Sequence, residues 1–125
     1  MADKNMVTIY DDKNKGTVAI AEDVLASIVG LAATEVEGVA ALGGNITNEK
    51  IGHIRRKTIF RGVKVDVLEG VASVRAIIYI RYGYSIPDVT RQVQERVKSA
   101  LENMTGLKVS DVNISVAEVV MDQAE

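Results

Sequence analysis

The side chains best suited to binding chemistry gather in one basic stretch in the middle of the chain. Positions 50 to 61 hold five cations and no carboxylate, in a chain whose formal net charge is −2. Such local positive charge is typical of a contact with anionic lipid headgroups, nucleic acid or an acidic partner surface. A solvated loop would account for the same residues, so both interpretations stay open. The five cations are Lys50, Arg55, Arg56, Lys57 and Arg61.

Residues that could support catalysis are scarce. His53 is the only histidine and cysteine is absent, which excludes a thiolate nucleophile, a disulfide framework and a thiolate metal site. No serine lies in a Gly-x-Ser-x-Gly elbow, and no two glycines have the spacing of a phosphate-binding loop or of the Gly-x-x-Gly clamp of KH domains. We therefore expect no enzymatic activity, no metal and no cofactor, and we interpret His53 as a surface or loop histidine.

A second candidate for binding is a small, uncharged face of the first predicted helix. No charged residue occurs between Val24 and Thr34. If the larger apolar side chains face the core, the opposite surface consists of Ala26, Gly30 and Ala33. Solvated helix faces normally carry charges. We therefore expect this face to pack against another protomer, an anchor protein, or residues 43–62 of the same chain.

A third candidate lies on a predicted strand after the turn at Glu69 and Gly70. Its residues alternate between an apolar side and a polar side, which indicates one buried face and one largely solvated face. Arginine and tyrosine on the polar side are common interface anchors, although an ordinary wet sheet face is the alternative. The apolar side holds Ala72, Val74, Ala76, Ile78, Ile80 and Tyr82, and the polar side holds Ser73, Arg75, Tyr79 and Arg81, with Ile77 as an apolar exception.

The elements that must position these residues follow from periodicity. A short strand at 17–21 precedes a helix that ends near Glu35, and most of 43–62 is interpreted as loop. A hairpin and a second helix follow, and a final strand carries Val112, Ile114 and Val116 inward. The order β-α-β-β-α-β is the split βαβ arrangement. We expect an α+β sandwich, with a mainly antiparallel sheet and two helices on one face.

The second helix has the clearest boundary signals. Ser85 is a plausible N-cap, Pro87 lies in the first turn and Gly106 fits a left-handed C-terminal stop. The first hairpin strand and the final strand should form the two sheet edges, where charged residues would guard against pairing with other chains. The helix buries a stripe of Val89, Val93, Val97, Leu101 and Met104, and the guarding charges are Lys64, Asp66, Lys108 and Glu118.

Length and composition fit one domain. The 125 residues are 47% hydrophobic, and the pI near 5.5 argues against nucleic acid as the ligand. The first residues lack the pattern of a signal peptide, and no stretch approaches the roughly 20 apolar residues of a membrane span. We expect a flexible segment over 1–15, a single domain over 16–121 and a cytoplasmic location.

Several landmarks, taken in order over about residues 16–120, resemble the alkaline-shock protein family of bacterial envelope stress proteins. Each is short, and their order carries the resemblance. They are Gly16-Thr17-Val18-Ala19-Ile20, Val36-Glu37-Gly38-Val39, Tyr82-Gly83, Ile86, Val89, Val93-Gln94, Val97, Thr105-Gly106-Leu107 and Val112-Asn113-Ile114.

The resemblance implies a cytoplasmic protein without an established active site, some relatives of which are held at the membrane by a separate anchor protein. It favours an interaction or scaffold protein of envelope stress or homeostasis, which acts by self-association or by binding a membrane-anchored partner. Two alternatives stay open. One is a nucleic-acid-binding module that uses segment 50–61 with Arg75, Tyr79 and Arg81, and the other is a small-ligand regulatory domain.

Overall fold

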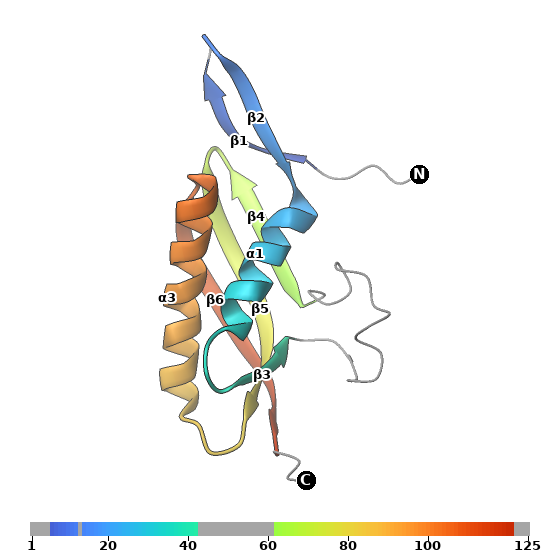
Figure 1. Cartoon of the computed structure of the whole chain (residues 1–125), viewed down its shortest axis with the longest axis vertical. Coiled ribbons are helices and arrows are strands. Elements are labelled where there is room, and N and C mark those ends of the chain that lie inside the picture. Colours follow the sequence, from blue (N-terminus) through green and yellow to red (C-terminus); the bar gives the residue numbers. More distant parts are fainter. Residues whose placement is uncertain (1–5, 13, 43–61, 122–125) are drawn as a thin grey trace, which may run out of the picture.

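The computed structural model describes residues 6–12, 14–42 and 62–121 (Figure 1). Eight elements follow one another along these residues. They are β1 (Met6–Asp12), β2 (Gly16–Ala21), α1 (Glu22–Thr34), β3 (Val39–Leu42), β4 (Val63–Leu68), β5 (Val71–Arg81), α3 (Ile86–Thr105) and β6 (Lys108–Val120).

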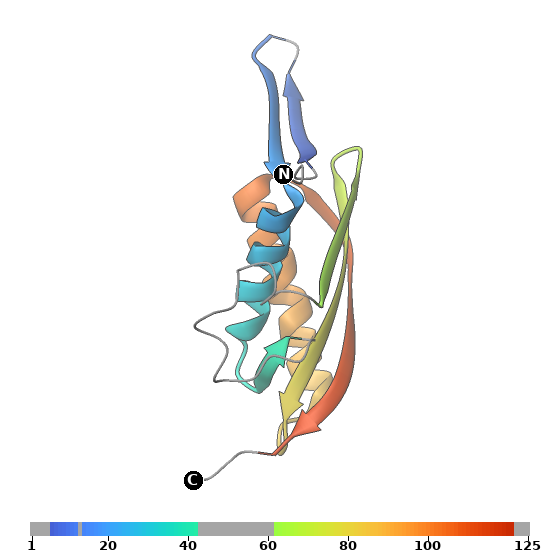
Figure 2. The same ribbon diagram turned by 90° about the vertical axis from the view of Figure 1, so that its right-hand side faces the viewer.

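Strand β5 is the centre of a four-stranded sheet. On one side it pairs along its whole length with β6, and the two strands are parallel. On its other side, β4 pairs antiparallel with its first half and β3 pairs antiparallel with its second half. Both α1 and α3 lie on the same side of this sheet, whereas no helix of the described residues covers the opposite side (Figure 2). The α+β prediction, with two helices on one face, is confirmed.

The core lies between the sheet and the two helices. Its fully buried side chains are apolar and come from every layer, which agrees with the alternation seen in the strands and with the helical stripes. Because β5 contributes every second residue to this core, its register against β4 and β6 is fixed by burial. The largest fully buried side chains are Leu25, Val29, Val74, Ile78, Ile80, Val93, Val97, Leu101 and Leu107.

The boundary signals of α3 have the predicted roles. The Ser85 hydroxyl accepts a hydrogen bond from the Asp88 backbone N–H at 3.3 Å, and Gly106 adopts a left-handed φ of 78°. The turn between β4 and β5 also has the predicted place, with positive φ at Glu69 and Gly70. One member of the predicted stripe is wrong, because Met104 is 71% exposed and Thr105 is buried in its stead.

The N-terminal region differs from the prediction. Residues 6–12 form β1, which pairs antiparallel with β2 in a separate two-stranded sheet that projects beyond the main body (Figure 1). These residues therefore form a strand within the segment over 1–15 that the sequence predicted to be flexible. Val7 and Ile9 pack with Ile20 at the margin of the core, which gives β1 an apolar side.

The strand at 16–21 consequently lies outside the main sheet, and β3 takes the place next to β5 after α1. The predicted element order lacked β1 and β3. Strand β3 has only four residues, and such short strands give almost no periodic signal.

Candidate functional site

The uncovered side of the sheet carries the residues most able to contact a partner. We call it the open face, and define it by outward-pointing residues of β4, β5 and β6. Lys64, Arg75 and Asn113 form one row across the three strands, since Arg75 is the register partner of both other residues. Ile77 and Ser115 are register partners in the next row. Two cations, an amide, a hydroxyl and an apolar side chain are thus brought together.

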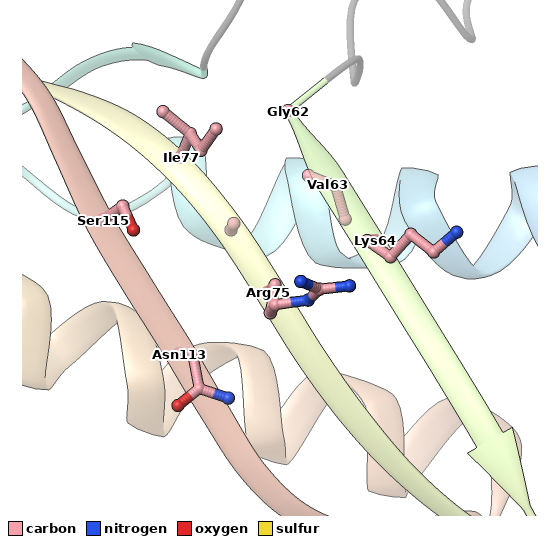
Figure 3. Close-up of a pocket in the computed structure, with 8 residues that line it drawn as sticks. Gly62, Val63, Lys64, Arg75, Ile77, Asn113 and Ser115 are labelled. Atoms are coloured by element: carbon pink, nitrogen blue, oxygen red, sulfur yellow. The ribbon is translucent and has the colours of Figure 1, made fainter.

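These residues line a groove with a volume of about 420 Å³ (Figure 3). Ile77 is 42% exposed, which is unusual for an isoleucine at the middle of a central strand. None of the described residues that line the groove carries a carboxylate, and two of them, Lys64 and Arg75, carry a positive charge. The lining consists of Gly62, Val63, Lys64, Arg75, Ala76, Ile77, Asn113 and Ser115.

The guanidinium of Arg75 has a weak intramolecular partner. Its Nη2 lies 3.9 Å from Oδ2 of Asp66, and both side chains are exposed. Exposed ion pairs of this kind contribute about 0–1 kcal/mol. A carboxylate from a partner can therefore compete for Arg75 at little cost to the fold.

A polar cluster around Asp111 adjoins the groove. The Asp111 carboxylate accepts hydrogen bonds from Ser110, Asn113 and Ser73, and these bonds hold its pKa below the ordinary value. Ser110 is an extra residue in β6, because the register passes from Val109 directly to Asp111. The cluster fixes the amide of Asn113, which also donates to the Val74 carbonyl at 3.3 Å.

The open face includes the predicted residues of β5. Arg75 lies in the groove, Tyr79 is half-buried opposite Ala41 and Glu118, and Arg81 is exposed at the end of the strand. Their role as contacts stays a prediction. Sequence reasoning did not find Asn113 and Ser115, although the outward parity of residues in the final strand was a usable signal.

The predicted interface on α1 requires correction. Gly30 and Ala33 are buried and Ala26 is half-buried, so these three residues do not form an exposed face. The reason is that α1 packs against α3 as well as against β3 and β4, which covers a wide arc of a helix made of small residues. Its exposed apolar side chains are instead Val24 and Leu31.

The basic segment predicted to contact an anionic partner lies outside the described residues. This holds for Lys50, Arg55, Arg56, Lys57 and Arg61, and also for His53. Their roles stay predictions. Within the described ranges, no group of three or more histidine, cysteine, aspartate or glutamate residues is placed to hold a metal ion. No helix within those ranges is long and apolar enough to cross a membrane.

Comparisons with known proteins give a consistent result. A family model described as "Asp23 family, cell envelope-related function" matches residues 10–121. The uncharacterized protein YqhY of Bacillus subtilis is 32% identical over 98% of this chain and 91% of its own length. The uncharacterized protein Spy1614 of Streptococcus pyogenes is 30% identical over 90% and 95%. A stress response regulator gls24 homolog of the same species is 27% identical over 84% and 59%.

Proposed function

The chain belongs to the Asp23 family, whose described function is related to the cell envelope. We propose that it is a non-catalytic interaction protein of envelope stress or homeostasis. In this proposal it works in the cytoplasm, binds a membrane-anchored protein partner through the open face, and self-associates. It requires no cofactor. The observation that carries the proposal is the groove with two cations beside an exposed isoleucine, on a sheet face that no helix of the described ranges covers.

The composition of the groove selects the chemistry of the partner. Lys64 and Arg75 provide positive charge, and Ile77 offers an apolar contact in the next row, beside Ser115 of β6. Charge complementarity favours a partner segment with carboxylates next to an aliphatic or aromatic side chain. Arginine beside a desolvated apolar centre is a frequent arrangement at the energetic centre of interfaces.

The size of the open face is compatible with a modest interface. Three strands span about 14 Å, and the eleven residues of β5 extend about 36 Å, from the usual strand spacing and rise. The resulting area of roughly 500 Å² is below the ~800 Å² per partner of standard stable interfaces. A reversible interaction, rather than a permanent complex, fits these dimensions.

A small anionic ligand is a second candidate occupant, since about 420 Å³ falls within the usual range of ligand pockets. Thermal unfolding with a panel of anionic metabolites distinguishes a small-ligand site from a site that binds only a protein partner. A ligand of the native state raises Tm with concentration, whereas a protein-only site gives no shift. The nucleic-acid alternative predicts binding that weakens steeply with salt.

The proposal is tested with two open-face variants, Arg75→Glu and Ile77→Asp. We expect both to reduce capture of membrane-extracted partners by the tagged chain at least tenfold, because one reverses the charge of the groove and the other removes its apolar centre. Lys98→Glu is the matched control, since Lys98 is also exposed but lies on α3. Circular dichroism confirms that each variant is folded. Unchanged capture by both open-face variants would refute the proposal.

A further inference from the structure

The outer edge of β6 is the longest backbone edge in the part of the chain that the structure describes. The strand spans 13 residues, and β5 occupies only one of its sides. Among the described residues, no strand pairs with the other side. Unprotected edges of this kind pair readily with other chains, so natural proteins guard them. The two halves of β6 are guarded very differently.

The first half of the edge is closed by α3. The Glu102 carboxylate accepts a hydrogen bond from the Val109 backbone N–H at 3.0 Å. The Gln94 side chain donates to the Val112 carbonyl at 2.9 Å. Between these two positions, the extra residue Ser110 interrupts the regular strand. A bulge together with backbone groups already occupied by side chains prevents another strand from pairing here.

Among the described residues, no side chain closes the second half of the edge in this way. The Val112 carbonyl points away from β5, and the Val120 carbonyl points toward it, where it accepts from Tyr82 at 2.8 Å. Backbone direction alternates along a strand, with one register shift after Val116. It follows that the N–H and C=O groups of Ile114 and Val116 point outward, as those of Val112 do. Positions 113–117 carry no charge.

We propose that this half of β6 pairs antiparallel with β6 of a second copy, about a two-fold axis at Ser115. Ile114 of each copy then lies opposite Val116 of the other, and their outward backbone groups form reciprocal hydrogen bonds. This pairing identifies the surface through which the chain would self-associate. It rests on the proposed function, which includes self-association. The resulting sheet continues from one copy into the next.

A second copy suits this edge better than an unrelated segment because the edge is complementary to itself. Ile114 and Val116 are both half-buried at the margin of the core, on the side of the sheet that the helices cover. In the dimer, Ile114 of each copy packs against Val116 of the other, which completes the burial of both side chains. The two-fold axis makes this contact occur twice. A charged partner would find no opposite charge at positions 113–117.

The two-fold axis makes a cross-linking test possible. Ser115 directs its own backbone toward β5, so two copies of this residue would face each other as a non-hydrogen-bonded pair, with Cα atoms about 4.5 Å apart. That separation permits a disulfide. The natural chain has no cysteine, so Ser115→Cys introduces a single thiol. We expect this variant to form a covalent dimer under mild oxidation at least tenfold faster than Ser99→Cys, an exposed serine on the side of α3 that faces Val36.

A second variant tests the same contact without a covalent cross-link. Ser115→Lys places two like charges face to face at the axis, and Ser115 is exposed in the single chain, so the fold is retained. Over a concentration series in sedimentation velocity, we expect wild type and Ser99→Lys to dimerise and Ser115→Lys to need at least tenfold more protein. A wild-type chain that stays monomeric, equal cross-linking at both positions, or an unchanged dimer of Ser115→Lys would overturn the inference. The proposed binding of a partner through the open face is tested separately. It would still stand in any of these cases if Arg75→Glu loses the capture of partners.

Discussion

The two faces of β5 differ sharply, since one belongs to the core and the other to the open face. Its even-numbered residues from Ala72 to Ile80 are at most 1% exposed and pack beneath the helices. Its odd-numbered residues include exposed Arg75 and Arg81, and Ile77 at 42%. Neighbours in sequence thus lie in opposite environments, about as different as a strand allows.

The contrast separates two kinds of constraint on the sequence. A slip of one residue in register would bring Arg75 and Ile77 into the core and expose Val74 and Ile78, which burial strongly disfavours. The covered face therefore holds the strand in place. The open face can then vary its chemistry without loss of the fold, and this freedom is what an interaction surface needs.

The sharpest test of this contrast compares two adjacent isoleucines. Ile78→Ala removes a fully buried side chain and should lower the free energy of unfolding by about 2–5 kcal/mol. Ile77→Ala removes an exposed one and should change it by only about 0.5 kcal/mol. Urea unfolding of both variants measures the difference. Equal losses would mean that the open face is covered in solution.

A smaller effect is expected at Asp111, on the open face. Hydrogen bonds from Ser110, Asn113 and Ser73 lower its pKa, so the ionised form is favoured in the folded state. A depressed pKa contributes stability above the unfolded value, near 4, and this contribution is lost as pH falls through the folded value. Asp111→Asn should therefore lower Tm slightly at neutral pH.

Thermal scans of Asp111→Asn and wild type from neutral pH downward provide the check. The gap in Tm should shrink as pH falls below about 4, because the carboxyl group of the unfolded chain takes up a proton there before that of the folded chain. It should vanish once pH lies below the lowered pKa of the folded state. If the gap in Tm stayed unchanged in acid, the charge of Asp111 would not contribute to stability. The substitution would then act only by altering the hydrogen-bond geometry.

Local signals explain which parts of the fold were predictable. The cap at Ser85, the stop at Gly106 and the turn at Glu69 each depend on residues close in sequence, and all three were predicted. Strand β1 was missed because charged residues follow directly after its short apolar alternation. The predicted exposed face of small residues on α1 was wrong for another reason. A helix packed on two sides buries a wider arc than its largest side chains indicate.

The site was only half predictable for a similar reason. Alternation alone placed Arg75, Tyr79 and Arg81 on the open face. Their neighbours on β6 depend on pairing between distant segments and on register shifts at Ser110 and Ala117. No local pattern reveals where such shifts occur, so the row that joins Arg75 to Asn113 became visible only in the structure.

Site-specific photo-cross-linking in cells tests the central claim most directly. A photoreactive amino acid is placed at Ile77 in one variant and, as the control, at Met104, which is more exposed but lies at the end of α3. The account predicts one membrane-anchored protein cross-linked at position 77 and absent at position 104. Cross-links to that protein from position 104, with none from position 77, would contradict it.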